Sequence, residues 1–357
     1  MTPPHHDAIL VGAGPIGLEL AVALKSLDVD YVHLDAGQIG QTVSWYPPQT
    51  TFFSSPDRIA IAGVPLVTPD QAKATREQYL AYLRGVVDQF DLRVNTYEKV
   101  TRVERDGDGK HVVHTQRADA TEHRYAAPHL VLAIGDMHAP RRLEIPGEDL
   151  PHVSHYFDDP HRYYRRKLLI VGGRNSAVEA ALRCHRVGAE VTVSYRGDDF
   201  EDNGVKYWLL PEINGLVRSG AIAFHPRTVP AEIRPGAATL RHARADGETP
   251  NGEAFDVESD FVLLLTGYAQ DKTLFERAGV TLEGENRAPR FDPETMETDA
   301  AGVFVAGTAA AGTQARFKLF IENCHPHAAR IARAIAGRRP DPRLINAAVE
   351  TYGLPES

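Results

Sequence analysis

Glycines at a spacing that suits a dinucleotide stand near the start of the chain. The run GAGPIG at 12–17 reads G-x-G-x-x-G between an apolar strand, 8–11, and an apolar helical stretch, 18–24. The first glycine allows a tight turn, the second lets a pyrophosphate approach the backbone, and the third lets helix and strand pack closely. The helix N-terminus then offers amide donors to the anion. A strand at 31–34 ends in Asp35, whose carboxylate can accept hydrogen bonds from a ribose diol. This pattern predicts dinucleotide binding through Gly12, Gly14, Pro15, Gly17 and Asp35.

A second loop of the same kind occurs in the middle of the chain. The run GGRNSA at 172–177 lies between a strand, 168–171, and a helical run, 178–187, although Arg174 stands where the second glycine is usual. The next strand, 190–195, is followed by Arg196 and not by an acid. A carboxylate there favours the free 2′-hydroxyl of NAD, whereas an arginine can pair with the 2′-phosphate of NADP. Two loops indicate two nucleotides, and the most economical pairing is FAD in the first and NADPH in the second.

Three further segments support a flavin. The runs LVLAIG, at 130–135, and FVLLLTG, at 261–267, are expected to be buried strands that end in glycine and connect nested domains. The run TDAAGVFVAGT, at 298–308, is expected to be a strand that ends in Gly307 and Thr308. A helical stretch near 317–323 follows it. We expect this last element to return to the first domain and to face the flavin ring.

Composition bounds the architecture and the partners. The chain has 357 residues, which predicts about two domains at roughly 150 residues each. A hydrophobic share of 43% is ordinary for a globular protein, and no apolar run reaches the length of a membrane span. The net charge of −9 argues against nucleic acid as a partner. The segment before the first expected strand is short and polar, unlike a secretory signal, so we expect a cytoplasmic protein. Only two cysteines occur, so we expect no structural disulfides.

With these residues in place, the whole chain resembles the small flavoproteins with two dinucleotide domains that are related to low-molecular-weight thioredoxin reductase. Within them it looks most like the bacillithiol-disulfide reductase-like family. The matching stretches cover nearly the full length: VGAGPIGLELAVAL, YPPQTTFFSSPDRIAIAGVP, IPGEDLPHVSHYF, IVGGRNSAVEAAL, VTVSYRG, LLPEINGLV and FIENCHPHAARIA. The resemblance implies an α/β fold of two Rossmann-like domains, with an NADPH domain at 139–267 inserted into an FAD domain at 1–138 and 268–357. It also implies a homo-oligomer.

The resemblance carries binding roles to matching positions. Besides the residues of the first loop, it implies flavin contacts from a set along the first domain: Gln41, Thr42, Tyr46, Phe53, Val100 (through its backbone, to the adenine), Gly135, Gly307 and Thr308. For NADPH it implies Gly172, Gly173, Asn175, Ser176 and Arg196.

The chain departs from its relatives at three places. The inserted domain has no Cys-x-x-Cys, so the chain does not work through the dithiol of a thioredoxin reductase. Related bacillithiol-disulfide reductases often carry a cysteine inside the glycine loop, where this chain has Ile16. Thioredoxin reductases have aspartate where this chain has Thr308.

Few groups remain for chemistry on a disulfide. Cys324 lies near the expected flavin-facing element and is followed by His325 and His327. A nearby imidazolium can lower the pKa of a thiol, although a small core residue is the alternative interpretation. His327 matches a family histidine and is the preferred proton donor, with water as the other source. Cys184 is expected in the core. No metal site is expected, because the histidines near Cys324 are too few for closed zinc coordination.

The leading hypothesis is an NADPH-dependent FAD oxidoreductase that reduces a low-molecular-weight disulfide of the bacillithiol type, with hydride passing from NADPH to FAD. The first alternative is a thioredoxin-reductase-like ferredoxin or flavodoxin reductase, whose partner is a small electron-carrier protein; the basic group near 162–167 can receive such an acidic carrier. The second is a flavin monooxygenase. A non-enzymatic nucleotide sensor is the last alternative.

Overall fold

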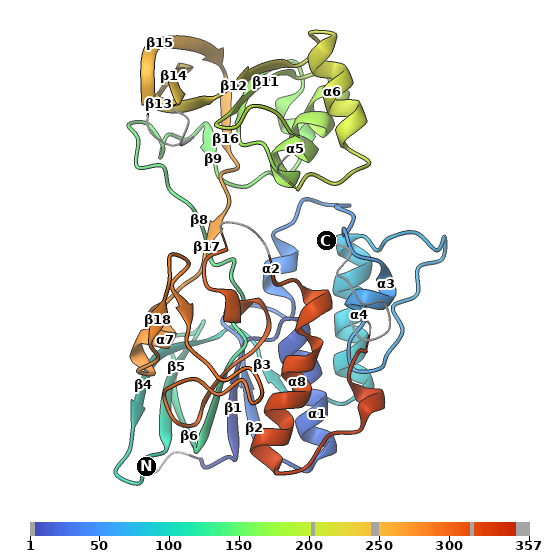
Figure 1. The fold of residues 1–357 in the computed structure, drawn as a ribbon, viewed down its shortest axis with the longest axis vertical. Coiled ribbons are helices and arrows are strands. Elements are labelled where there is room, and N and C mark those ends of the chain that lie inside the picture. Colours follow the sequence, from blue (N-terminus) through green and yellow to red (C-terminus); the bar gives the residue numbers. More distant parts are fainter. Residues whose placement is uncertain (1–3, 201–203, 244–249, 315–317, 348–357) are drawn as a thin grey trace. The chain divides into compact units, whose positions relative to one another are not determined.

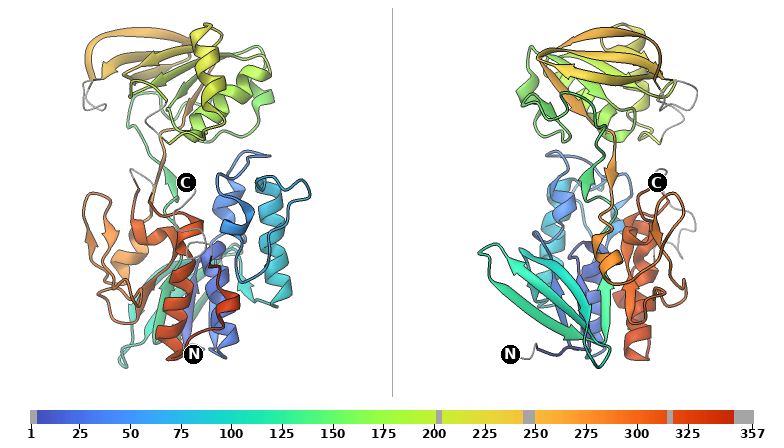
Figure 2. Two further views of the ribbon diagram at one scale, coloured as in Figure 1. Left: turned by 45° about the vertical axis from the view of Figure 1, so that its right-hand side comes forward. Right: turned by 90° about the vertical axis from the view of Figure 1, so that its left-hand side faces the viewer.

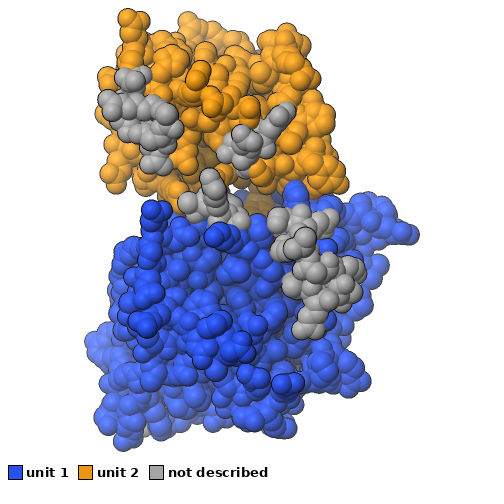
Figure 3. Space-filling model, viewed as in Figure 1, with its two compact units in different colours: residues 1–45, 49–139, 268–357 blue, residues 46–48, 140–267 orange. Residues whose placement is uncertain are grey.

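The computed structural model describes residues 4–200, 204–243, 250–314 and 318–347. The chain divides into two compact units, coloured separately in Figure 3. The first unit contains Met1–Trp45, Gln49–Ala139 and Tyr268–Ser357, and the second contains Tyr46–Pro48 and Pro140–Gly267. Two short strands, β8 (Ala139–Pro140) and β17 (Tyr268–Ala269), pair with each other where the chain passes from one unit to the other.

The first unit is built on a five-stranded parallel sheet. Its strand order is β20-β7-β1-β2-β3, and every neighbouring pair runs parallel. The strands are β1 (Ala8–Val11), β2 (Tyr31–Leu34), β3 (Val94–Asn95), β7 (His129–Leu132) and β20 (Val303–Val305). Residues of β1 and β20 are buried throughout, as the unbroken apolar runs require of strands covered on both faces.

Helices cover one face of this sheet. α1 (Pro15–Ser26) lies beside α8 (Ile321–Ala336), as Figures 1 and 2 show. Nine consecutive residues of α1, 16–24, are buried, because the helix is covered by both the sheet and α8. The shorter helices of this unit are α2 (Gln41–Ser44), α3 (Pro56–Ile59) and α7 (Thr273–Arg277), and α4 spans Arg76–Gln89.

An antiparallel sheet contacts the parallel sheet of the first unit. It contains β4 (Glu98–Arg105), β5 (His111–Arg117) and β6 (Glu122–Ala127). β6 contacts β1, and β4 contacts β2. The remaining elements are a hairpin of β18 (Leu282–Glu283) and β19 (Ala288–Pro289), and 3₁₀ turns at Gly307–Ala311 and Pro342–Leu344.

The second unit repeats the parallel design. Its sheet has the order β12-β11-β10-β16-β9, again parallel throughout. The strands are β9 (Val153–Ser154), β10 (Lys167–Val171), β11 (Glu190–Tyr195), β12 (Ala223–Pro226) and β16 (Phe261–Leu264).

Two apolar clusters hold the second unit together. One packs α5 (Asn175–Arg186) and α6 (Leu210–Arg218) on the sheet, with a 3₁₀ turn at Pro160–Tyr163. The other packs β10 and β16 against an antiparallel sheet of β13 (Thr228–Arg234), β14 (Gly236–Ala243) and β15 (Pro250–Ser259). Figure 1 labels β13, β14, β15 and β16.

The predicted fold class is confirmed. The strands predicted at 8–11, 31–34 and 190–195 have the observed bounds, and both glycine loops lie between a parallel strand and a helix. The two three-stranded antiparallel sheets were not predicted. The helical stretch expected near 317–323 falls partly outside the described residues, and α8 begins later, at Ile321, and continues to Ala336.

Candidate functional site

The first glycine loop leaves open space at one position only. A Cβ placed on Gly12 would lie 2.3 Å from the carbonyl oxygen of Ala133, and one on Gly17 would lie 2.0 Å from the carbonyl oxygen of Gly12. A Cβ on Gly14 would meet nothing within 4 Å. Gly14 is also the N-cap of α1, and no side chain caps this helix. The loop therefore has a tight turn, a close strand–helix contact and a bare helix N-terminus, which is the form that fits a pyrophosphate.

Asp35 is held beside this loop. The backbone N–H of Ala13 donates to its Oδ2 at 2.6 Å, and that of Gly37 donates to its Oδ1 at 2.8 Å. Each carboxylate oxygen thus has one backbone donor and keeps acceptor capacity. The position at the end of β2, next to the loop, suits a ribose diol, as the sequence predicts.

The loops that follow β1, β7 and β20 meet at the carboxyl edge of the sheet. Gly135 and Gly307 have φ angles of +70° and +69°, which glycine adopts readily. A Cβ on Gly307 would lie 3.5 Å from Cβ of Ile16, and one on Gly135 would lie 3.8 Å from Oγ1 of Thr308. Gly307 therefore lies beside the first glycine loop, and Gly135 lies beside Thr308, as expected if these residues surround one ligand.

The other predicted flavin residues are more dispersed. Gln41 and Thr42 begin α2, and this segment is tied to the loop because the N–H of Gly40 donates to the carbonyl of Ala13 at 3.0 Å. Phe53 is half-buried, with the Lys73 ammonium 5.2 Å from its ring centroid. Val100 is buried in β4 opposite a residue of β5. Tyr46 belongs to the segment grouped with the second unit.

The second glycine loop packs against an aromatic ring. Gly172 has a φ of +141°, and its Cβ would lie 2.5 Å from the carbonyl oxygen of Leu265. A Cβ on Gly173 would lie 2.4 Å from the ring of Tyr195. Only glycine fits at these two places, which explains the unusual Gly-Gly start of the loop.

The polar residues of the second loop divide into two groups. Ser176, in the first turn of α5, and Arg196, just after β11, are exposed to solvent. The side chain of Asn175 is already engaged, since its Oδ1 accepts from the N–H of Lys206 at 2.6 Å. Asn175 therefore fastens the neighbouring segment to the loop, a role that the sequence does not reveal.

The environment of Cys324 is the reverse of the one considered from sequence. Its side chain is fully buried, and its Sγ lies 3.8 Å from Oδ1 of Asn323. Burial raises the pKa of this thiol, with a further contribution from nearby carboxylates. The flanking His325 bonds instead to Oε2 of Glu19, at 2.7 Å, and to the carbonyl of Arg58, at 2.9 Å. The two histidines that follow in the sequence do not lower the pKa of the thiol. The lowered pKa that the sequence suggested for a catalytic Cys324 is therefore wrong, and the pKa is raised instead.

His327 does not carry the proton expected of a donor. Burial, with a smaller effect of Arg330, lowers its pKa to about 4. Its Nδ1 accepts the N–H of Gly307 at 3.2 Å, which leaves the ring proton on Nε2. A neutral imidazole in this state supports the turn after β20. It is a poor acid at neutral pH.

The sequence analysis missed an acidic residue at the carboxyl edge of this sheet. Asp136 directly follows Gly135, is buried, and accepts a hydrogen bond from Nε2 of Gln314 at 2.9 Å. Burial raises the pKa of its carboxyl. The available signal was its place in the run LVLAIGD: an acid just after a predicted strand, as Asp35 is.

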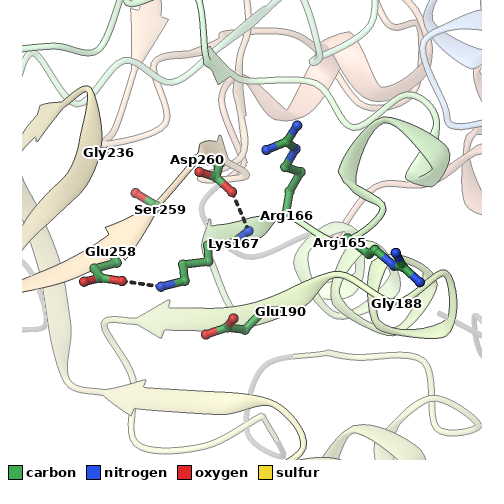
Figure 4. A pocket seen from close by; sticks show the side chains of 9 residues that line it. All are labelled: Arg165, Arg166, Lys167, Gly188, Glu190, Gly236, Glu258, Ser259 and Asp260. Atoms are coloured by element: carbon green, nitrogen blue, oxygen red, sulfur yellow. Dashed lines mark hydrogen bonds and ion pairs between the residues drawn. The ribbon is translucent and has the colours of Figure 1, made fainter.

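A pocket of about 380 Å³ lies in the second unit, and Figure 4 shows the side chains that line it. It is lined by Arg165, Arg166, Lys167, Gly188, Glu190, Gly236, Glu258, Ser259 and Asp260. Lys167 starts β10, whereas the glycine loop follows the carboxyl end of that strand. Lys167 is also paired with Glu258. Because nucleotides bind outside the carboxyl ends of parallel strands, this pocket is not the nucleotide site.

Neither a cluster of metal ligands nor a membrane-spanning helix occurs within residues 4–200, 204–243, 250–314 and 318–347. Within those ranges, no group of three or more His, Cys, Asp or Glu side chains is placed to hold a metal ion. Among the helices of the same ranges, none is long and apolar enough to cross a membrane.

Known proteins match the chain over most of its length. Residues 9–307 match the family model described as pyridine nucleotide-disulphide oxidoreductase. The chain is 37% identical to the bacilliredoxin reductase Bdr of Bacillus subtilis, over 94% of this chain and 98% of that protein. The solved bacillithiol disulfide reductase Bdr of Bacillus cereus matches with a TM-score of 0.86 and 37% identity, covering 94% of this chain and 100% of that one. A ferredoxin–NADP reductase of Ignicoccus hospitalis is 30% identical over 84% of this chain and 89% of its own.

Proposed function

The chain belongs to the pyridine nucleotide-disulphide oxidoreductase family, and from this premise we propose that it is an NADPH-dependent FAD enzyme that reduces a low-molecular-weight disulfide of the bacillithiol type. The observation that carries the proposal is the 37% identity to a Bdr protein over 94% of this chain and 98% of that protein. The family model, which matches residues 9–307, spans both glycine loops and the whole of the second unit.

The first unit supports FAD binding through its own geometry. The open space at Gly14 and the uncapped N-terminus of α1 receive the pyrophosphate, and Asp35 receives the ribose. The loops that carry Gly135, Gly307 and Thr308 enclose the flavin half. When bound, the flavin accepts hydride from the nicotinamide and passes the electrons on, which is chemistry that the protein cannot supply itself.

The second unit supports NADPH binding. The tight turn at Gly172 brings the backbone to the N-terminus of α5, where Ser176 is exposed. Arg196 stands at the end of β11, the position that reads the adenosine ribose in this fold. A guanidinium group at this position favours the 2′-phosphate of NADPH over a free 2′-hydroxyl.

The proposal gives no enzyme thiol a role in the reaction. The glycine loop has Ile16, which is buried against the turn at Gly307, and no Cys-x-x-Cys is present in the sequence. Cys324 is buried with a raised pKa. His327 is neutral at neutral pH, so the protein neither forms a mixed disulfide at these positions nor protonates the leaving thiolate from this histidine. Water is the remaining proton source of the two considered from sequence.

The test is anaerobic NADPH oxidation with a panel of acceptors. Oxidised bacillithiol, oxidised glutathione and a ferredoxin are compared at equal concentration with the purified, FAD-loaded protein. The proposal expects the small disulfides to stimulate turnover, with oxidised bacillithiol first. Stimulation by ferredoxin alone would favour the reductase function that the Ignicoccus relative is named for, and would refute the disulfide assignment. The homo-oligomer stays a prediction, to be measured by light scattering.

A further inference from the structure

Asp136 lies beyond the carboxyl end of the parallel sheet in the first unit, where we propose that the nucleotide binds. It is the fourth residue after β7, whose carboxyl end lies between those of β1 and β20 in the sheet. The loop after β7 is close to the glycine loop, since a Cβ on Gly12 would lie 2.3 Å from the carbonyl oxygen of Ala133. Ligands of open parallel sheets bind in the crevice outside these carboxyl ends.

The carboxyl group of Asp136 is fixed from two directions. Oδ2 accepts from Nε2 of Gln314 at 2.9 Å, and the side chain of Thr308 also hydrogen-bonds the carboxyl. Gln314 is itself held, because its Oε1 accepts the backbone N–H groups of Lys318 and Leu319 at 2.8 and 3.0 Å. Two side chains, one of them fixed by the backbone in turn, thus orient one buried acid, which is the arrangement of a preorganised binding group.

The nearest cation does not neutralise this acid. Lys272 is close enough to affect Asp136 electrostatically. Its Nζ, however, donates to Oε1 of Gln270 at 2.9 Å, to Oγ1 of Thr313 at 3.1 Å and to the carbonyl of Asn286 at 3.2 Å. An ammonium group has three N–H donors, so these acceptors use all of them. Within the described residues no ion pair to Asp136 forms, and a buried carboxyl without one is costly unless it has a further partner.

We propose that Asp136 is a flavin-binding residue, whose carboxyl accepts a hydrogen bond from a hydroxyl group on the ribityl chain of the cofactor. Thr308 and Gln314 are its positioning residues. The inference rests on the proposed binding of FAD to the first unit and adds a contact that neither the glycine loop nor Asp35 provides. The adenosine half of the cofactor makes no part of this contact.

Substitution of Asp136 by asparagine replaces one acceptor oxygen by an NH₂ donor and removes the charge, without changing the size of the side chain. Because Gln314 donates to the Oδ2 position, an asparagine oxygen occupies that position and the amide NH₂ replaces the acceptor on the other side. We expect D136N to weaken FAD binding by about tenfold, as for the loss of one hydrogen bond that involves a charged group. ADP lacks the flavin half, so its affinity should not change.

The experiment measures the dissociation constants of FAD and ADP for the apoprotein by calorimetry, together with its thermal midpoint. Asp119→Asn is the matched control, because that aspartate is exposed in the first unit and bonds only to a neighbouring turn. The double variant D136N/T308D returns a carboxyl to the same place, since residue 308 already reaches that of Asp136. It should recover most of the FAD affinity.

The outcomes separate the two proposals. If wild-type protein binds no FAD, the proposed function itself fails. If wild type binds FAD and D136N binds it equally well, or loses ADP affinity to the same extent, the assignment of Asp136 is overturned. Should D136N fail to fold, the double variant decides alone: FAD affinity near that of wild type supports the inference, and a tenfold loss with intact ADP binding refutes it.

Discussion

Alanine should have opposite effects at the two glycines near the start of α1, Gly14 and Gly17: loss of FAD affinity at the first and loss of stability at the second. A Cβ on Gly14 meets nothing within 4 Å, and the residue has φ −77° and ψ −179°, which alanine adopts without strain. Alanine is a poorer N-cap than glycine, which costs roughly 0.5–1 kcal/mol of stability. It also restricts the unfolded chain, which stabilises the folded state by a similar amount. Gly14→Ala should therefore leave the free energy of unfolding of the apoprotein within about 1 kcal/mol of wild type.

The same methyl group fills the space that we assign to the pyrophosphate. FAD affinity of Gly14→Ala should fall at least about tenfold, which corresponds to 1.4 kcal/mol or more. In Gly17→Ala the added Cβ lies 2.0 Å from the carbonyl oxygen of Gly12, so the strand–helix contact must open. We expect a loss of about 3 kcal/mol or more of stability, at the upper end of overpacking effects.

The assay compares urea unfolding of the two apoproteins with their FAD titrations followed by flavin fluorescence. Gly85→Ala serves as the control, because it lies in α4 with nothing within 4 Å of its added Cβ. If Gly14→Ala binds FAD as tightly as wild type, the pyrophosphate is not at this loop. If it is destabilised as strongly as Gly17→Ala, the space at Gly14 is not open, and the geometric argument fails.

Three further predictions concern single side chains. Cys324→Ala should keep kcat/KM within about twofold of wild type, because the buried thiol takes no part in the reaction; a loss of about a hundredfold in steady-state assays, with folding intact, would restore a catalytic cysteine. Arg196→Ala should raise KM for NADPH by about tenfold or more while KM for NADH changes little, because we propose that the guanidinium bonds the 2′-phosphate; equal effects on both nucleotides would contradict this role. His327 has a pKa of about 4 when folded and an ordinary value of 6.5, so the folded state binds this proton less readily than the unfolded state does. Its contribution to stability is present above pH 6.5 and is lost as pH falls toward 4, by about 3 kcal/mol in total. Urea unfolding of wild type and His327→Gln between pH 7 and 4.5 checks it, and parallel pH profiles would show that the histidine is not buried and neutral.

The geometry of the two glycine loops was predictable because their signals are local. A glycine that needs a positive φ, or that touches the next strand, must be glycine whatever the rest of the chain does. The runs at 12–17 and 172–177 therefore identify their turns without knowledge of the fold. Asp35 and Arg196 follow from the same logic, since each comes directly after the second strand of its βαβ unit.

The roles of the α8 residues could not be predicted because they depend on tertiary burial. From sequence, Cys324 followed closely by two histidines resembles an activated thiol. In the structure His325 turns to Glu19, 306 residues away in the chain, and His327 turns to Gly307. Asn175 likewise bonds Lys206 across 31 residues. Adjacency in sequence gave no information on which partner each polar group selects.

The antiparallel sheets were missed for a different reason. β4 alternates buried and exposed residues only in part, with a bulge between Val100 and Arg102. β13 and β14 are also interrupted by a shift in register. Such irregular strands lose the two-residue period by which strands are found in sequence.

The proposed reaction is tested most directly by an anaerobic absorbance titration of the FAD-loaded protein, first with NADPH and then with oxidised bacillithiol. We expect NADPH to bleach the flavin band and the disulfide to restore it, in wild type and in Cys324→Ala alike. A flavin that NADPH does not bleach, or that stays bleached when the disulfide is added, would contradict it.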